Sequence, residues 1–239
     1  MPALLIALVV FAAAFAQSLT GFGFALVVMP LVTIVLGVRT AAPVVALAGV
    51  TVYAINLARY RRAINVPEVL RLAVASAVGV PFGIWVLSNA SEDLVMRILG
   101  LILVAYAAYS LLQPGTERVL SRGWVYPAGF LAGCLGGAYN TPGPPVVVYG
   151  SMRKLPRDEF RAVLQTLFFI NGVLVVTSHA LAQHLTREVL VYYLCAVPAL
   201  ALGILVGSVV DPRMNHDQFR WIVTVMILVL GLALLLGVG

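Results

Sequence analysis

The scarcity of charge is the feature that most restricts how this chain can fold. Only 10% of its 239 residues are charged, whereas 62% are hydrophobic. A soluble domain carries about 25% charged residues, and so few charges could not cover a water-exposed surface of this size. The chain is therefore predicted to lie in the lipid bilayer as an all-α polytopic membrane protein.

Apolar segments divide the chain into about ten candidate membrane elements. A helix needs about 20 apolar residues to cross a bilayer. The second and seventh segments are shorter than this, and the seventh, PGPPVVVYGSM, is too short for an ordinary span. The segments cover roughly 2–19, 24–38, 41–58, 69–89, 94–112, 123–139, 142–152, 160–181, 188–209 and 218–238.

The positions of lysine and arginine predict the orientation. Only Arg39, Arg97 and Arg187 follow even-numbered segments, and every other basic residue follows an odd-numbered one. Basic loops stay in the cytoplasm, so both termini are predicted to lie outside. The predicted orientation is the same whether segments 1–2 and 6–7 cross the membrane fully or form re-entrant hairpins. The sequence does not decide between these two arrangements. The net charge of +6 thus reflects orientation, and no nucleic-acid partner is expected.

The two halves of the chain resemble each other. TGFGFALVV, from Thr20, parallels NTPGPPVVV, from Asn140, and Gly83 and Gly203 recur at the same offset of 120 positions. We predict a first repeat over 1–115, with segments 1–5, and a second over 116–239, with segments 6–10. Because five is odd, the second repeat must enter the membrane inverted, which is a common architecture of secondary transporters.

Glycine and proline break the two short segments at corresponding positions of the halves. Asn140 or Thr141 is expected to cap a new half-helix that begins near residue 142, where prolines fit the first turn. In the first half, Gly21 and Gly23 are expected to make the same break through backbone freedom. One such break alone could be a packing surface or a kink. Two at equivalent positions of an inverted repeat indicate a binding site at the midplane.

The half-helix ends are expected to offer hydrogen-bond donors. A helix N-terminus presents free N–H groups and the positive end of the helix dipole, and so favours anions. In the first break the free donors are expected to be the N–H groups of residues 21–24. In the second they are those of Thr141 and Gly143, with the Thr141 hydroxyl and the Asn140 amide. The candidate substrate-binding residues are Gln17, Gly21, Phe22, Gly23, Phe24, Tyr139, Asn140, Thr141, Gly143 and Asn171.

The acidic residues narrow the substrate class. All of them lie in loops or at segment ends, whereas a buried cation or a proton relay usually needs a carboxylate within a span. The sequence therefore favours a small anionic solute, with proton or sodium coupling left open. The histidines form no metal pattern, and neither a metal nor a cofactor is expected.

Further polar residues are candidates for the path of the anion. Asn171 lies centrally in segment 8, with Gln165 and Thr166 before it, and either lines the cavity or bonds between helices. Arg39 and Arg157 follow the two short segments and are candidate vestibule residues that attract anions to opposite mouths. Ordinary anchoring at the membrane interface is the alternative for both.

Two stretches resemble a known family. GFGFALVVMPLV and GGAYNTPGPPVVVYG are similar to the two Gly/Pro signatures of the TauE/SafE sulfite-exporter family, and the resemblance extends over nearly the whole chain. The first stretch has Phe22 and Phe24 where glycine or other small residues often occur. The resemblance implies export of sulfite, an organosulfonate or a related sulfur-containing anion across the inner (plasma) membrane.

Other functions remain as alternatives. No H-E-x-x-H, G-x-S-x-G or paired membrane carboxylate is present, so an intramembrane enzyme is not expected. A non-transporting membrane subunit or scaffold would depend on a protein partner. An anion channel would show uncoupled, non-saturating flux. The sequence leaves a homo-oligomer open.

Overall fold

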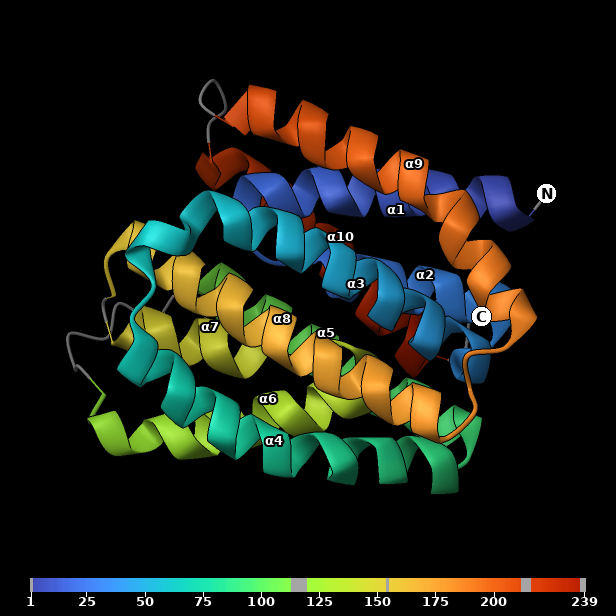
Figure 1. Ribbon diagram of the computed structural model, residues 1–239, viewed down its shortest axis with the longest axis horizontal. Coiled ribbons are helices and arrows are strands. Elements are labelled where there is room, and N and C mark those ends of the chain that lie inside the picture. The colour runs from blue at the N-terminus through green and yellow to red at the C-terminus, as the bar shows by residue number, and fades with distance from the viewer. Residues whose placement is uncertain (1, 113–119, 154, 212–215, 237–239) are drawn as a thin grey trace.

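The computed structural model describes residues 2–112, 120–153, 155–211 and 216–236 (Figure 1). Within this part the chain is helical and has no strand, so the prediction of an all-α protein is confirmed. The described residues form ten α-helices, and 3₁₀ turns lie at Arg61–Ala63 and Arg122–Trp124. The helices are α1 Pro2–Thr20, α2 Phe24–Leu36, α3 Val38–Tyr60, α4 Val66–Asn89, α5 Glu92–Leu112, α6 Val125–Tyr139, α7 Gly143–Met152, α8 Arg157–Leu181, α9 Arg187–Val210 and α10 His216–Leu235.

Several of these helices are long and apolar enough to cross a membrane. In the described residues there are four such stretches, Val38–Ala63, Val66–Asn89, Asp158–Leu181 and Arg187–Val210. Leu4–Thr20, Phe24–Leu36 and Met96–Leu112 are apolar but shorter. Large apolar side chains such as Phe82, Trp85 and Leu205 are exposed on the outside. This is the surface of a multi-pass membrane protein, which faces lipid instead of water.

The short helices are those that the sequence predicts. α2 has 13 residues and α7 has 10, and they begin within one residue of the predicted starts at 24 and 142. α1 and α2 pack against each other, as do α6 and α7. Each short helix is thus the second arm of a bent pair whose corner is the Gly/Pro break.

Helices from the two parts of the chain pack side by side along their length. α1 lies along α9, α3 along α8, α4 along α6 and α5 along α10. In Figure 1, α9 and α1 form the upper row, α3 and α8 the middle row, and α4 and α6 the lower row. α3 ends and α8 begins at the left of the figure. α4 ends and α9 begins at the right, where the start of α1 and the end of α10 also lie.

Glycines allow α4 and α6 to approach closely. A Cβ placed on Gly133 of α6 would lie 2.9 Å from the Cα of Gly79 and would overlap the carbonyl oxygen of Ser76. A Cβ on Gly79 would in turn lie 2.8 Å from the backbone nitrogen of Cys134. Small residues at helix contacts let backbones pack directly, which is the main source of helix association in lipid.

Candidate functional site

The first break is held by two glutamines. Gly21 and Gly23 have φ of 82° and 105°, which only glycine adopts without strain. The Gln17 side chain of α1 accepts a hydrogen bond from the N–H of Phe24 at 3.0 Å and donates one to the carbonyl of Gly21 at 3.2 Å. Gln165 of α8 donates to the same carbonyl at 2.6 Å. Both amides are buried, so together they pair the polar backbone that the break exposes.

This pairing corrects the expected set of free donors. The N–H of Gly21 donates to the Gln17 carbonyl at 2.8 Å, and that of Phe22 to the Thr20 hydroxyl at 3.3 Å. With the N–H of Phe24 bound to Gln17, three of the four predicted donors are occupied. Only the N–H of Gly23 has no acceptor among the described residues. A Cβ on Gly23 would meet nothing within 4 Å, so the space beside this donor is open.

The second break is built differently from its prediction. Asn140 ends α6 in the left-handed conformation, with φ of 55°, and its side-chain amide donates to the carbonyl of Ala42 on α3 at 2.7 Å. The N–H of Thr141 donates to the carbonyl of Leu135 at 3.2 Å and is not free. The Thr141 hydroxyl is buried and has no partner among the described residues, so it does not cap α7. Asn140 thus terminates one helix, and Thr141 Oγ1 is an unused donor at the start of the next.

Aromatic side chains separate the two breaks. The ring of Phe24 lies edge-on to Tyr53 of α3, at 6.4 Å between centroids, and Tyr53 lies 5.2 Å from Phe168 of α8. A Cβ on Gly143 would lie 3.5 Å from the tip of Phe168. Tyr53 and Phe168 therefore bridge from the start of α2 to the start of α7. Along α8, the breaks adjoin Gln165 and Asn171, which a helical rise of 1.5 Å per residue places about 9 Å apart.

A small cavity lies beside the second break. Asn140, Asn171, Tyr53 and Phe168 line it, and its volume is about 10 Å³. Such a volume holds one water molecule at most. Asn171 donates from Nδ2 to the carbonyl of Ala132 at 3.3 Å, and its buried Oδ1 has no partner among the described residues. The cavity therefore has two asparagine side chains in a mostly apolar lining, and it is too small for a substrate in this conformation.

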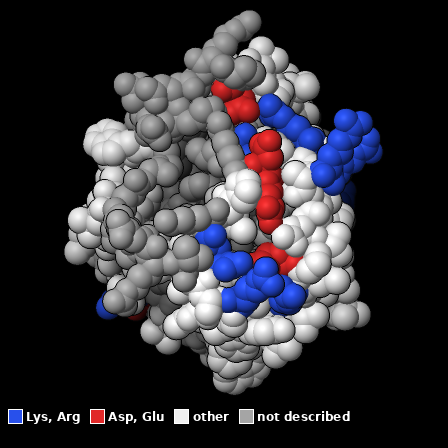
Figure 2. Space-filling view, turned by 90° about the vertical axis from the view of Figure 1, so that its left-hand side faces the viewer, with Lys and Arg blue, Asp and Glu red and all other residues white. Residues whose placement is uncertain are grey.

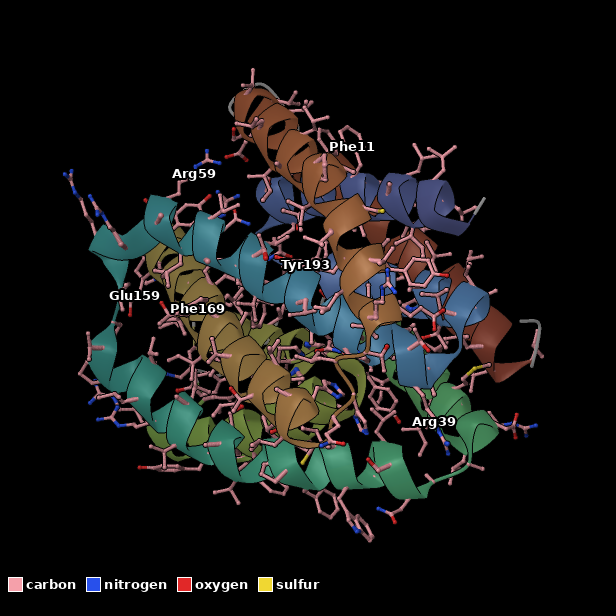
Figure 3. The ribbon with its side chains drawn as sticks, turned by 45° about the vertical axis from the view of Figure 1, so that its right-hand side comes forward. Phe11, Arg39, Arg59, Glu159, Phe169 and Tyr193 are labelled. Atoms are coloured by element: carbon pink, nitrogen blue, oxygen red, sulfur yellow. The ribbon has the colours of Figure 1, made fainter. Side chains whose placement is uncertain are left out.

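The remaining predicted residues lie around this centre or at its ends. Phe22 packs edge-on against Tyr106 of α5, at 6.0 Å between ring centroids, and Tyr139 is buried at the end of α6. Arg39 lines a cavity of about 400 Å³ with His179 and His184. In Figure 3, Arg39 is at the end of the bundle opposite to Arg59 and Glu159. Arg157 is the first residue of α8, and its side chain lies outside the described part.

Sequence reasoning missed one basic residue of the site. Arg161 was expected in a basic loop, but it lies in α8 and is buried. Its Nη2 donates to the carbonyl of Leu19 at 2.9 Å, at the end of α1, and its Cγ lies 3.2 Å from the position of a Cβ on Gly21. The guanidinium of Arg161 therefore supports the corner of the first break. Arg161 lies one helical turn before Gln165 on α8.

The family model "Sulfite exporter TauE/SafE" matches residues 6–234, which include both breaks and all ten helices except the first residues of α1 and the last residue of α10. The chain belongs to the TauE/SafE family. Members of this family are membrane transporters and not enzymes, so the broken helices belong to a transport protein.

A curated relative agrees with this assignment to the TauE/SafE family. The "Probable sulfite/organosulfonate exporter TauE" of Cupriavidus necator is 26% identical over 227 residues, which cover 92% of this chain and 88% of the relative. The similarity thus extends over nearly the full length of both proteins. No solved structure matches the chain significantly.

The shared carbonyl of Gly21 leads to a prediction about the two glutamines. Gln17→Leu or Gln165→Leu alone leaves this carbonyl with one donor, whereas the double variant leaves it buried with none. An unpaired buried polar group costs about 1–3 kcal/mol. The stability of the purified variants is measured by thermal unfolding in detergent. The double variant is therefore expected to lose more stability than the two single variants lose together, by about 0.5 kcal/mol or more. Thr166→Val, which removes only a bond to its own helix, serves as control, and strictly additive losses would contradict the prediction.

Proposed function

We propose that the protein exports a small sulfur-containing anion, either sulfite or an organosulfonate, across the plasma membrane. The family and the name of the C. necator relative support this substrate class. The site between the breaks supports it too, since its neutral hydrogen-bonding groups suit an anion better than a metal cation. The observation that carries the proposal is the pair of broken helices, with Tyr53 and Phe168 bridging from the start of one to the start of the other.

The helix pairing supports two inverted repeats, over 1–115 and 116–239. If each helix is exchanged for its counterpart in the other half, α1 becomes α6 and α9 becomes α4. The contact between α1 and α9 then corresponds to the contact between α6 and α4. Because α3 likewise becomes α8, the contact between α3 and α9 corresponds to the contact between α8 and α4. The pairs α3–α8 and α5–α10 map onto themselves. This correspondence is expected of a pseudo-twofold axis in the membrane plane.

The proposed transport cycle is alternating access around the breaks. Cavities of about 400 Å³ and 430 Å³ lie at opposite ends of the bundle, whereas the central cavity has room for a single water. In this cycle the conformation described here is occluded, with Tyr53 and Phe168 closing the path. The anion would bind the Thr141 hydroxyl, the N–H of Gly143 and the N–H of Gly23 when these aromatic rings move aside.

The positive-inside rule supports an orientation for this cycle. α3 ends and α8 begins at the left of Figure 1, and Figure 2 views that face, where blue and red side chains gather. We place this face in the cytoplasm and both termini outside. An exporter of this orientation takes up its substrate at the face in Figure 2.

Ligand-dependent stability tests the proposed function. Purified protein is heated with sulfite, sulfate, thiosulfate or sulfoacetate at matched ionic strength, with cations as controls. A ligand present at a hundredfold excess over its Kd stabilises the native state by about 2.7 kcal/mol. We expect sulfite or a sulfonate to stabilise the protein more than sulfate does, and this additional stabilisation to be lost in Asn140→Ala and Gly143→Val proteins that still insert into the membrane. Stabilisation by no anion would favour a scaffold, and non-saturating flux in proteoliposomes would indicate a channel.

The unpartnered Thr141 hydroxyl gives a sharper prediction. Thr141→Val replaces a buried, unsatisfied hydroxyl by a methyl group of similar size, so stability is expected to stay level or to rise by about 1 kcal/mol. Transport is expected to weaken, with a higher KM for sulfite in proteoliposomes. Thr33→Val is the matched control, because Thr33 Oγ1 is also buried without a partner among the described residues but lies in the body of α2. An unchanged KM in Thr141→Val would remove Thr141 from the site.

A further inference from the structure

A second polar cavity lies at the face shown in Figure 2, away from the breaks. Its volume is about 430 Å³. Three arginines line it from three separate places in the chain: Arg71 on α4, Arg122 in the turn before α6, and Arg153 directly after α7. Asn65, Glu68 and Glu159 complete its polar wall. The three connections beside these groups, α3–α4, α5–α6 and α7–α8, are among those predicted to be cytoplasmic.

The carboxylates of this cavity already have partners. Glu68 is almost fully buried and accepts a hydrogen bond from the hydroxyl of Tyr149 on α7. Arg71 approaches Glu68 with an N–O distance of 3.5 Å. Glu159 accepts a hydrogen bond from the Asn65 amide at 2.7 Å. The acidic groups are thus held in the wall, and they balance only part of the arginine charge.

The arginines keep unused donors. Arg153 donates from Nη1 to the carbonyl of Leu120 at 3.0 Å, while its buried Nε has no partner among the described residues. Arg122 forms no ion pair within the described part of the chain and is exposed. Guanidinium groups bind planar or tetrahedral oxyanions through paired N–H donors. An anion of this kind is the group that would satisfy these donors.

We propose that this cavity is a loading site for a small oxyanion, held by Arg122 and Arg153, with Arg71 turning from Glu68 to the anion when the site is filled. That the anion is loaded here for export, and not released here after import, rests on the proposed function. Arg71 and Tyr149 bind the same carboxylate, so filling the site changes the partners of a residue that ties α4 to the broken helix α7. The occupied cavity is in this way coupled to the helix whose first turn forms the transport site.

Transport kinetics test the loading site. Arg122→Gln and Arg153→Gln are reconstituted into proteoliposomes, and sulfite export is measured from the loading side at constant ionic strength. Loss of one charge-assisted contact is expected to raise KM for sulfite roughly tenfold and to leave the saturating rate within about twofold. The matched control is Arg62→Gln, which removes one exposed positive charge from the same face but outside the cavity. Equal KM values in the wild type and both cavity variants, or an equal rise in Arg62→Gln, would overturn the proposal.

A binding measurement separates this site from the transport function. Stabilisation of the detergent-purified protein by sulfate is titrated for the wild type, Arg122→Gln, Arg153→Gln and Asn140→Ala. A half-saturation concentration that rises in the arginine variants but not in Asn140→Ala supports the loading site, even if no transport is detected. A rise in none of them overturns it, even if transport is normal.

The same donors could hold the headgroup of an anionic lipid. The kinetic measurement is therefore repeated in vesicles of phosphatidylcholine alone and with phosphatidylglycerol. We expect the difference in KM between the wild type and Arg122→Gln to persist in both. If it appears only with phosphatidylglycerol, the cavity binds lipid and the loading site for a free anion is overturned.

Discussion

Leucine at Gly133 is expected to prevent α4 and α6 from packing together. Even a single methyl carbon at this position overlaps the carbonyl oxygen of Ser76 and lies 2.9 Å from the Cα of Gly79. Both neighbours are backbone atoms and cannot move without separating the helices. Overpacking usually costs about 1–3 kcal/mol, and contact with rigid backbone places this case at the upper end or above. We expect a loss of about 3 kcal/mol or more, measured as a lower unfolding temperature and a lower yield of monodisperse protein.

A second glycine controls for the side chain itself. Gly123, in the turn before α6, is exposed, and a Cβ there would have only Ser121 Oγ within 4 Å, at 3.9 Å. Gly123→Leu is expected to keep the stability of the wild type within about 0.5 kcal/mol. Gly133→Leu protein as stable as Gly123→Leu would show that α4 and α6 do not pack through this contact.

Local sequence signals could predict the helices and the breaks. Runs of apolar residues and the positions of glycine and proline depend on neighbours within a few residues. For this reason the starts of α2 and α7 were predictable to within a residue, as was the break at Gly21 and Gly23. The same information cannot show which groups fill the space around a break.

The partners of the breaks come from distant parts of the chain. Gln17 is seven residues from Phe24 and occupies its N–H, which was predicted to be free, and Gln165 reaches the carbonyl of Gly21 from another helix. Tyr53 and Phe168 were not predicted, because an aromatic residue on an apolar helix has the same pattern whether it faces lipid or a transport path. Glu68 was expected at a segment end, and it lies in the first turn of α4. Its burial was not predicted, because its hydrogen-bond partner Tyr149 is on α7.

Arg161 is the residue whose removal is expected to have the largest effect on the first break. Its Nη2 donates to the carbonyl of Leu19, and its Nη1 donates to the hydroxyl of Tyr60 at 3.0 Å and lies 3.7 Å from Asp211 Oδ2. The guanidinium also stacks on the ring of Tyr60, at 5.6 Å from its centroid. Arg161→Met keeps much of the side-chain volume but removes the donors to the Leu19 carbonyl and the Tyr60 hydroxyl, while Asp211 keeps its ion pair with Arg59. An unpaired buried polar group costs about 1–3 kcal/mol, and because two oxygens lose their donor we expect a loss of about 2–4 kcal/mol with little remaining transport.

Arg59 provides the matched control, since it binds the same carboxylate from a more exposed position. Its Nη2 lies 3.1 Å from Asp211 Oδ2, with 37% of its side chain exposed. Because exposed ion pairs contribute about 0–1 kcal/mol, Arg59→Met is expected to unfold near the wild-type temperature. If both variants lost equal stability, the support of the α1 corner by Arg161 would be disproved.

The contribution of charge can be separated from that of hydrogen bonding to the break. Arg161→Lys keeps the positive charge, but a single ammonium cannot bond Leu19 and Tyr60 in the fork geometry of a guanidinium. If charge next to Asp211 is the main requirement, Arg161→Lys restores most of the stability. If the bond to the Leu19 carbonyl fixes the corner, stability returns in part while transport stays low, because the break beside Gly21 is no longer held in place. We expect the second outcome, since Arg59 still neutralises Asp211 when Arg161 is replaced, whereas the Leu19 carbonyl loses the guanidinium donor that holds the end of α1.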